Sequence, residues 1–315
     1  MKGSKKGIHI LASTPALRKR LIHIFQNLNH TNQLPFPIEL IQSPGDAKET
    51  HLLFFEPDLE RMEDSKKELH QLLAIFRSNV VLMCPTEHDN LKLASQCGIG
   101  NILMPGSLSE STVRAVTAKL LGKDFFGCSP FFPNGYTHFE KTYFFSGRFQ
   151  VKDFPKNHFQ DFVDSLDPEE RHYFSAYVSE LMTNALIYSV YEVTPEERDQ
   201  NQTSFPQYVV IPREKEIKIR IVRDDEKYGI SITDKTGALT LLRVLEKIQR
   251  QTTAPDKPVP EGVYDLTGRG FFILSKQTRL IINIQKRVKT EIILLRYNDP
   301  SLNKYQALII NEKEK

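Results

Sequence analysis

The chain has 315 residues, which at about 150 residues per domain suggests two domains. Its 40% hydrophobic and 26% charged residues are ordinary for a folded protein and exclude a collagen-like or fibrous chain. Because 42 basic residues nearly balance 39 acidic ones, the net charge of +3 provides no general field for nucleic acid or an anionic membrane, and neither is expected as a partner.

The N-terminus, residues 1–7, is basic, but the apolar stretch after it is short and is interrupted by His9. This pattern is not that of a signal peptide. No later run approaches the roughly 18 apolar residues that a membrane helix needs. Cys84, Cys97 and Cys128 form no C-x-x-C pair, so we expect reduced thiols in a cytoplasmic protein.

Short apolar runs alternate with helix-length amphipathic stretches from residue 7 to about residue 122. The runs expected to be strands are 8–11, 38–41, 52–55, 80–83 and 102–104. The stretches expected to be helices are 15–28, 61–76, 88–96 and 109–121. This order is typical of α/β proteins and predicts a small, doubly wound parallel sheet.

Neither periodicity continues through residues 125–140, which contain several prolines and glycines. We therefore predict a linker there, between an N-terminal domain over residues 1–124 and a C-terminal domain over residues 141–315. The elements expected after the linker are a strand over 141–151, a long helix from Asp167, strands over 216–223 and 228–233, a helix over 240–250, a polar loop over 251–265, another helix, and a hairpin over 280–297. Helices kept apart from an antiparallel sheet predict an α+β two-layer sandwich.

The five β/α units resemble the receiver domain of response regulators, which has a flavodoxin-like fold. That family holds Mg²⁺ with an acidic pair after the first strand, but residues 12–14 are Ala-Ser-Thr and supply no carboxylate. Glu56 stands where the phosphoacceptor Asp would be, and Met104 stands where the Lys that ends the fifth strand would be. Only a hydroxyl near the fourth strand, Thr86, remains. The resemblance therefore implies a pseudo-receiver that docks a partner or the second half.

Glu56 has two interpretations. Its carboxylate could mimic a phosphorylated Asp and lock the domain in an on-like state, or it is a solvated residue at the end of a strand. We prefer the second interpretation, because Glu has half the charge of a phosphoryl group and none of its geometry.

The long helix contains Ser-Glu-Leu-Met-Thr-Asn-Ala over residues 179–185, where Glu180 and Asn184 lie one turn apart on the same face. This segment resembles the N box of the GHKL ATPase superfamily and is similar to the Ser-Glu-x-x-x-Asn-Ala motif of bacterial anti-sigma factor serine kinases. Residues 230–237 resemble the first glycine box, and Thr-Gly-Arg-Gly at 267–270, before an apolar helix start, resembles the second.

The resemblance implies a Bergerat (GHKL, HATPase-type) fold that binds ATP and Mg²⁺. In this family Glu180 would be catalytic by orienting or deprotonating the attacking hydroxyl, and Asn184 would bind Mg²⁺ together with phosphate oxygens. Asp234 would accept from the adenine amino group. The residues implied for nucleotide binding are Asn184, Asp234, Gly237, Gly268, Arg269, Gly270 and Thr290. The glycines would let phosphates approach a helix N-terminus.

Three features depart from the family pattern. The first glycine box usually reads Asp-x-Gly, but Thr236 occupies that glycine position and the glycine follows as Gly237. Tyr188 stands where anti-sigma kinases often have His. Residues 193–214 form a longer and more polar segment than the short connection expected there. Residues 251–265 form the lid in the family, and Lys257 or Arg269 could reach phosphate from it, although a solvated loop charge is the simpler interpretation. These departures bear more on phosphoryl transfer than on nucleotide binding.

The resulting hypothesis is a cytoplasmic signalling regulator that phosphorylates or sequesters a protein partner, either an anti-sigma antagonist or a sigma-factor-like protein. As an enzyme it would be a serine/threonine kinase. The alternative is an inactive, nucleotide-gated interaction module. A homodimer is compatible with the resemblance. A histidine kinase is excluded because residues 125–164 are too short for the two-helix hairpin that carries its phosphoacceptor, and the nine histidines show no metal-binding spacing.

Overall fold

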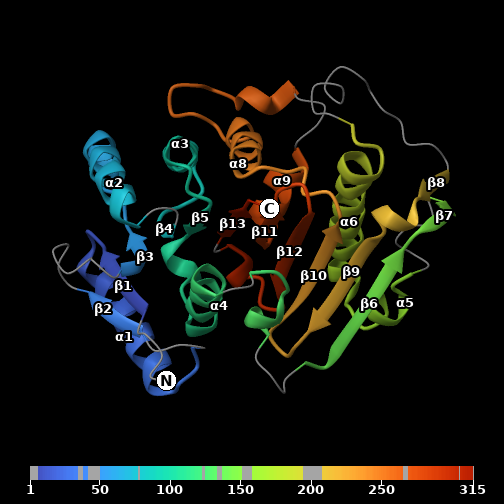
Figure 1. Cartoon of the computed structure of the whole chain (residues 1–315), viewed down its shortest axis with the longest axis horizontal. Helices are drawn as coiled ribbons and strands as arrows, with labels where there is room; N and C mark the ends of the chain where they lie inside the picture. The colour runs from blue at the N-terminus through green and yellow to red at the C-terminus, as the bar shows by residue number, and fades with distance from the viewer. Residues whose placement is uncertain are drawn as a thin grey trace.

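The computed structural model describes residues 6–34, 38–41, 50–76, 79–122, 125–132, 137–150, 158–193, 208–264, 269–304 and 306–314. Figure 1 shows a mixed α/β molecule in which one large sheet runs through both halves of the chain. No helix of these residues is both long and apolar enough to cross a membrane.

The first half has the predicted strands and helices. The strands are β1 (Lys6–Leu11), β2 (Ile38–Ile41), β3 (Thr50–Phe55), β4 (Val80–Leu82) and β5 (Asn101–Leu103). They pair in parallel in the order β2-β1-β3-β4-β5. The helices are α1 (Pro15–His30), α2 (Met62–Phe76), α3 (His88–Cys97) and α4 (Glu110–Leu121).

The two faces of this parallel sheet bury different helices, as the alternation of side chains along a strand requires. Leu52 and Phe54 of β3 belong to the core that contains the buried residues of α1 and α4. Leu53 and Phe55 belong to the core formed with α2 and α3. Helices therefore cover both faces of the sheet, as predicted for a doubly wound arrangement.

The second half is built on an antiparallel sheet in the order β6-β9-β10-β12-β11. Its strands are β6 (Phe139–Phe145), β9 (Ile217–Arg223), β10 (Lys227–Asp234), β11 (Arg279–Gln285) and β12 (Lys289–Tyr297). Its helices are α5 (Gln160–Val163), α6 (Pro168–Ala185), α8 (Leu241–Arg250) and α9 (Arg269–Gln277). Asp167 caps α6 as predicted, accepting from Glu170 N at 2.9 Å.

Residues 141–151 were expected to form a single strand, and this prediction was wrong. The segment contains the end of β6 and a separate strand, β7 (Gly147–Gln150), which pairs with β8 (Tyr208–Ile211) in a second, two-stranded sheet. Gly147 has a φ of 83°, a left-handed conformation that turns the chain out of the large sheet.

One further strand, β13 (Ala307–Lys313), joins the two halves and was not among the predicted elements. It pairs in parallel with β11 and antiparallel with β5, so the sheet continues over eleven strands. Gly100, next to β5, touches it so closely that a Cβ there would lie 2.3 Å from Ile310 O. In Figure 1, β13 lies between β5 and β11 near the centre of the molecule.

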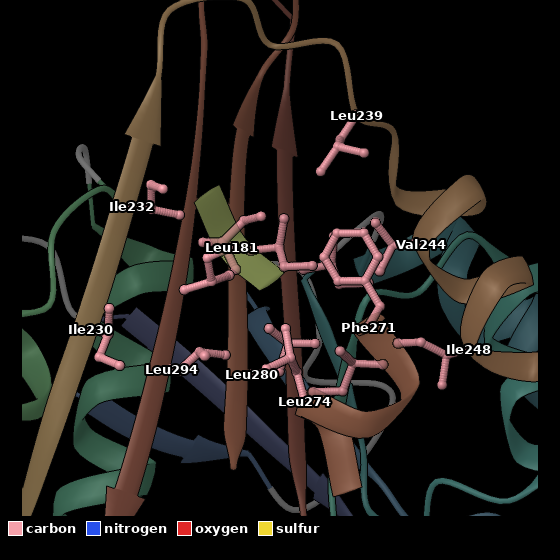
Figure 2. Close-up of a cluster of buried hydrophobic side chains, with 14 of the residues drawn as sticks. Leu181, Ile230, Ile232, Leu239, Val244, Ile248, Phe271, Leu274, Leu280 and Leu294 are labelled. Carbon is pink, nitrogen blue, oxygen red and sulfur yellow. The ribbon is translucent and has the colours of Figure 1, made fainter. Parts of the chain in front are cut away.

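Helices α6, α8 and α9 pack on the same face of the second-half sheet and bury one apolar core. Figure 2 shows this core, in which Leu181 of α6 meets residues of β10, β11 and β12 beside α8 and α9. The labelled side chains are Leu181, Ile230, Ile232, Leu239, Val244, Ile248, Phe271, Leu274, Leu280 and Leu294. The core fixes the two helices, α6 and α9, that carry the predicted N box and second glycine box.

The opposite face of the second-half sheet is partly covered by residues 125–132, which belong to the segment predicted as a linker. Phe131 and Phe132 are buried in the same core as Ile293 and Leu295 of β12. Gly127 N donates to Glu291 Oε2 at 2.7 Å, and Lys119 Nζ of α4 donates to Gly127 O at 2.7 Å. This part of the segment is thus packed between the two halves.

Candidate functional site

Glu180 and Asn184 meet on the last turns of α6, as their four-residue spacing predicts. Asn184 Nδ2 donates to Glu180 Oε1 at 2.9 Å, and Asn184 is only 5% exposed. The helix then changes to a π-helical turn, Leu186–Val190. Single π-turns occur often at functional sites. Here the turn brings Tyr188 and Ser189 to the end of β10.

Asp234 ends β10 and is held by the turn that follows it. Thr236 donates to Asp234 Oδ1 from its backbone N at 2.9 Å and from its hydroxyl at 2.7 Å. Ser189 Oγ lies 3.0 Å from Thr236 Oγ1. Burial raises the pKa of Asp234, while hydrogen bonds from Thr236, Ser189 and Gly237 act in the opposite direction. Thr236, which stands where the sequence comparison expects a glycine, therefore caps the aspartate with its hydroxyl.

Gly237 is required by the backbone. Its φ is 60°, and a Cβ there would lie 2.2 Å from Gln285 O. Gly237 O accepts from Arg287 N at 3.2 Å, in the turn that joins β11 to β12. Gly237 thus lets the first-box turn pack against that hairpin, and the structure gives it this role whether or not it also approaches a nucleotide.

Thr290 of β12 lies directly opposite Asp234 in the antiparallel register. It is 1% exposed, and among the described residues its Oγ1 has no hydrogen-bond partner. Buried hydroxyls are nearly always paired, so an unpaired one beside a carboxylate indicates a place where a ligand or water would bond. Thr290 and Asp234, both predicted from the sequence as nucleotide-binding residues, therefore lie side by side on neighbouring strands.

The N-terminus of α9 contacts Glu180. A Cβ placed on Gly270 would lie 1.7 Å from Glu180 Oε1, so any other residue there would force the Glu180 side chain to move. The Arg269 guanidinium donates to Val263 O and thereby holds the start of α9 to η8 (Glu261–Tyr264) at the end of the predicted lid. Gly268, predicted to approach phosphate, lies outside the described residues.

The predicted lid is folded against α8 in the part that the structure describes. Gln251 Nε2 donates to Gly262 O at 2.8 Å, which closes the loop on itself. Lys257, considered for phosphate, instead contacts Glu261 on the surface. The interpretation of Lys257 as a solvated loop charge fits this contact.

Asn184, Asp234 and Thr290 line one cavity, together with Tyr188. The volume is about 10 Å³, which is room for about one water molecule. Tyr188 is 8% exposed, and its hydroxyl accepts from Lys247 Nζ of α8 at 2.9 Å. A nucleotide base would enter only after side chains at this wall move.

The donor set fits a nucleotide in its chemistry. The unpaired Thr290 hydroxyl and the Asp234 carboxylate can bond a base edge, and the start of α9 lies beside Glu180 and Asn184. The described residues contain no group of three or more His, Cys, Asp or Glu side chains able to hold a metal. Mg²⁺ would therefore depend on one carboxamide oxygen of Asn184 and on phosphate oxygens, as the resemblance implies.

The second predicted site lies at the carboxyl ends of β1, β3 and β5. Glu56 Oε2 accepts from Thr14 N at 2.7 Å and from Ser13 Oγ at 3.0 Å, and Glu56 Oε1 accepts from Thr14 Oγ1 at 2.8 Å. Glu56 and Met104 line one cavity of about 440 Å³. These two residues, named together from the sequence, therefore lie in one cavity, and Glu56 is anchored by the loop after β1.

Thr86, suggested as the remaining receiver-like hydroxyl, does not line that cavity. Its hydroxyl donates to Gln306 just before β13, and its carbonyl accepts from Lys276 Nζ of α9 at 3.2 Å. The loop after β4 is thus engaged by the second half.

Tyr188, Ser189 and Lys247 were not assigned to the site from the sequence. Tyr188 was noted only as a departure from the family, and nothing in its local sequence indicates the π-turn that points it inward. On α8, Arg243 and Lys247 are four residues apart, so both cations reach the same ring, at 5.7 and 5.3 Å from its centroid. This spacing could have indicated, from the sequence alone, that the two cations lie on one face of the helix.

Comparisons of the chain with protein-family models and with curated proteins give no match. The resemblance to the GHKL superfamily and to receivers therefore rests on the motifs quoted above.

Proposed function

We propose that this chain is an ATP-binding signalling regulator with its site between α6, β10, β12 and α9. The observation that carries the proposal is the buried, unpaired hydroxyl of Thr290, opposite Asp234 and in the same cavity as Asn184. Three segments far apart in sequence, each matching a family box or strand, supply these residues. Their convergence supports a GHKL-type second half that takes ATP with Mg²⁺.

The closed cavity favours nucleotide gating over constitutive binding. Tyr188 fills the wall and is held by Lys247, so base entry is coupled to movement of the π-turn or of α8. Helix α8 leads into the predicted lid and packs against α3 of the first half. Nucleotide binding would therefore change the surface that this region presents to a protein partner, such as an anti-sigma antagonist or a sigma-factor-like protein in the cytoplasm. A homodimer remains compatible with this reading.

Glu180 supports a second candidate, a serine/threonine kinase. Its carboxylate lies against the N-terminus of α9 and is oriented by Asn184, which is the place for a base that accepts the proton of an attacking hydroxyl. ATP would supply the phosphoryl group. The first half is proposed as a pseudo-receiver, because its strand order is flavodoxin-like and Glu56 and Met104 lack the chemistry of phosphotransfer.

The test is calorimetric titration of the full chain with Mg²⁺-ATP. Saturable binding should be lost in Asn184→Ala and Asp234→Ala, and it should survive in Lys257→Gln, a loop variant that leaves the cavity intact. Absence of saturable binding by the unchanged protein would refute the proposal. For the kinase candidate, Glu180→Gln should keep ATP affinity but abolish the transfer of phosphate from ATP to a serine or threonine of a protein acceptor, measured as ADP and phosphorylated acceptor. A Glu180→Gln protein that transfers phosphate as fast as the unchanged one would contradict a base role for Glu180.

A further inference from the structure

A row of buried polar side chains crosses the large sheet on the face that also buries Ile281, Ile293 and Ile309. Glu291 of β12 accepts from Ser231 Oγ of β10 at 2.7 Å and from Asn283 Nδ2 of β11 at 2.9 Å. Asn283 Oδ1 in turn accepts from Asn311 Nδ2 of β13 at 2.8 Å. The hydrogen bonds therefore lead, strand by strand, to Asn311 on the strand that joins the two halves.

A cavity of about 280 Å³ lies at this end of the row, and Asn311 lines it. The other lining residues of this junction cavity come from α4, β5, β13 and the start of α8, so both halves form its wall. Its volume is close to the lower end of small-molecule pockets, which form preferentially at junctions between domains. A Cβ at Gly100 would lie 2.3 Å from Ile310 O, so the strands on either side already touch and cannot move closer.

Asn101 of β5 provides an unpaired acceptor in the wall of the junction cavity. It is 3% exposed, and among the described residues its Oδ1 has no hydrogen-bond partner. Its Nδ2 makes a long contact of 3.5 Å with Val80 O, and the Nδ2 of Asn311 is already bonded to Asn283. In both asparagines the carboxamide oxygen is therefore the end able to take up a further bond. Because buried acceptors are nearly always paired, Asn101 Oδ1 indicates a ligand that donates an N–H or O–H.

The ionisable side chains that line the cavity in the described chain are already engaged by the protein. Lys119 Nζ donates to two backbone carbonyl oxygens in the segment after α4. Lys313 Nζ lies 4.3 Å from the centre of the Phe125 ring and has a further partner. Glu312 accepts from the first backbone N–H of α8 and lies 2.9 Å from Lys286 Nζ. A charged ligand would lose its hydration without gaining an unpaired counterion, so an uncharged ligand is favoured.

Apolar side chains form another part of the wall. They are Leu120 of α4, Phe125, Leu241 of α8 and Ile310 of β13. Phe125 and Ile310 are 3% and 1% exposed, so they are fixed by packing. A ligand that fills the cavity would therefore place an apolar body against these residues and its hydrogen-bond donor against the asparagines.

We propose that the junction cavity binds a small, uncharged ring compound that carries a carboxamide or an aromatic amino group. Its N–H donates to Asn101 Oδ1, and its ring packs on the apolar wall. An aliphatic amine is excluded because it would be protonated and charged at neutral pH. A ligand in this place contacts strands of both halves and stabilises the folded chain. The cavity shares no lining residue with the candidate nucleotide site, so the proposal is independent of the proposed function.

The probe is nicotinamide, titrated calorimetrically into the full chain, with methyl nicotinate and nicotinate as matched arms. Methyl nicotinate keeps the ring and lacks the N–H, and nicotinate replaces the carboxamide with a charge. We expect saturable binding in the millimolar range or tighter for nicotinamide and binding at least about tenfold weaker for each of the other two compounds.

Asn101→Leu removes the unpaired acceptor and should weaken nicotinamide at least about tenfold while leaving methyl nicotinate nearly unchanged. The matched control is Asn90→Leu, because Asn90 is also buried with an unpaired Oδ1 but does not line the cavity. Its nicotinamide affinity should equal that of the unchanged protein. Leu120→Phe, at a partly exposed lining position, fills the cavity without touching the asparagines and should weaken nicotinamide and methyl nicotinate alike.

Thr290→Val separates this site from the nucleotide site and should leave nicotinamide binding unchanged. The proposal is overturned by absence of saturable nicotinamide binding or by methyl nicotinate or nicotinate that binds as tightly. It is also overturned if Asn101→Leu and Leu120→Phe both bind nicotinamide like the unchanged protein, or if Thr290→Val abolishes the binding.

Discussion

At the scale of single residues, two neighbouring polar groups at the candidate site differ in their hydrogen bonding. Asp234 is bonded by the turn that follows it, whereas Thr290, directly across the ladder, has a buried hydroxyl without a described partner. An unpaired buried hydroxyl costs free energy, so the fold gains nothing from it. This contrast makes Thr290 the residue whose replacement best separates function from stability.

Thr290→Val should leave the free energy of unfolding unchanged or raise it by up to about 1 kcal/mol, because it removes a desolvated group and keeps the branched shape. Affinity for Mg²⁺-ATP should fall about tenfold. Denaturant unfolding and calorimetry measure the two effects. In the control Thr278→Val, the lost hydroxyl donates to Leu274 O at 2.7 Å, so stability should fall by about 1 kcal/mol. Equal destabilisation by both variants would contradict the argument.

Asp234 predicts a dependence of stability on pH. Burial raises its pKa above the ordinary value of 3.8, so the folded chain binds this proton more tightly than the unfolded chain. The contribution of the protonated group is then complete below pH 3.8 and is lost as pH rises through the higher folded pKa. Relative to Asp234→Asn, the unchanged protein should become less stable from about pH 4 upward; parallel stability curves would contradict this.

Asp234 and Thr290 could be proposed from the sequence because the motifs of the resembling family place one at the end of a strand and the other on the neighbouring strand. The sequence could not predict that Thr236 bonds Asp234 or that Tyr188 closes the cavity. The bonds from Thr236 lie within the turn that follows β10, whereas the position of Tyr188 depends on the π-turn after α6, which contains no proline or glycine. Packing against β10 and α8, and not local propensity, decides that geometry.

At the scale of elements, the contact between α6 and α9 brings two predicted boxes together. Gly270 and Glu180 are in contact, and Glu180 is bonded to Asn184. The sequence was sufficient to identify the two motifs, the helix cap at Asp167 and the hairpin of β11 and β12. It was not sufficient for the division of 141–151 between two sheets, because this division depends on the left-handed turn at Gly147, and a glycine in a strand pattern, such as Gly229 of β10, need not adopt that conformation.

Gly270→Ala should push the Glu180 carboxylate away from Asn184 and cost about 1 kcal/mol of stability through the lost hydrogen bond. In an Glu180→Ala background the same change should cost nothing or stabilise, since alanine favours a helix more than glycine does. The double-mutant cycle therefore predicts a coupling of about 1 kcal/mol, measured by denaturant unfolding. Additive effects of the two changes would show that the helices do not constrain each other.

At the scale of the whole molecule, β13 makes one sheet of what sequence patterns divide into two domains. Its apolar run was visible, but nothing local indicates that it pairs with β5 as well as with β11. Strand partners so distant in sequence are set by the tight fit at Gly100 and by the cores on both faces. The predicted domain boundaries mark where the sequence pattern changes, but the large sheet continues across them. The two halves could therefore unfold either separately or as one unit.

Phe25→Ala distinguishes these two cases. Phe25 of α1 is fully buried against Phe54 of β3 in the first half, and removal of its ring should cost about 3–5 kcal/mol. If the eleven-stranded sheet unfolds as one unit, hydrogen-exchange protection of the slowest amides in β10 should fall by the same free energy as in β3. Phe144→Ala, at a side chain 61% exposed on β6, should change neither. Undiminished protection in β10 of the Phe25→Ala protein would mean that β13 joins two independently stable domains, and nucleotide binding in the second half would then be insensitive to the first.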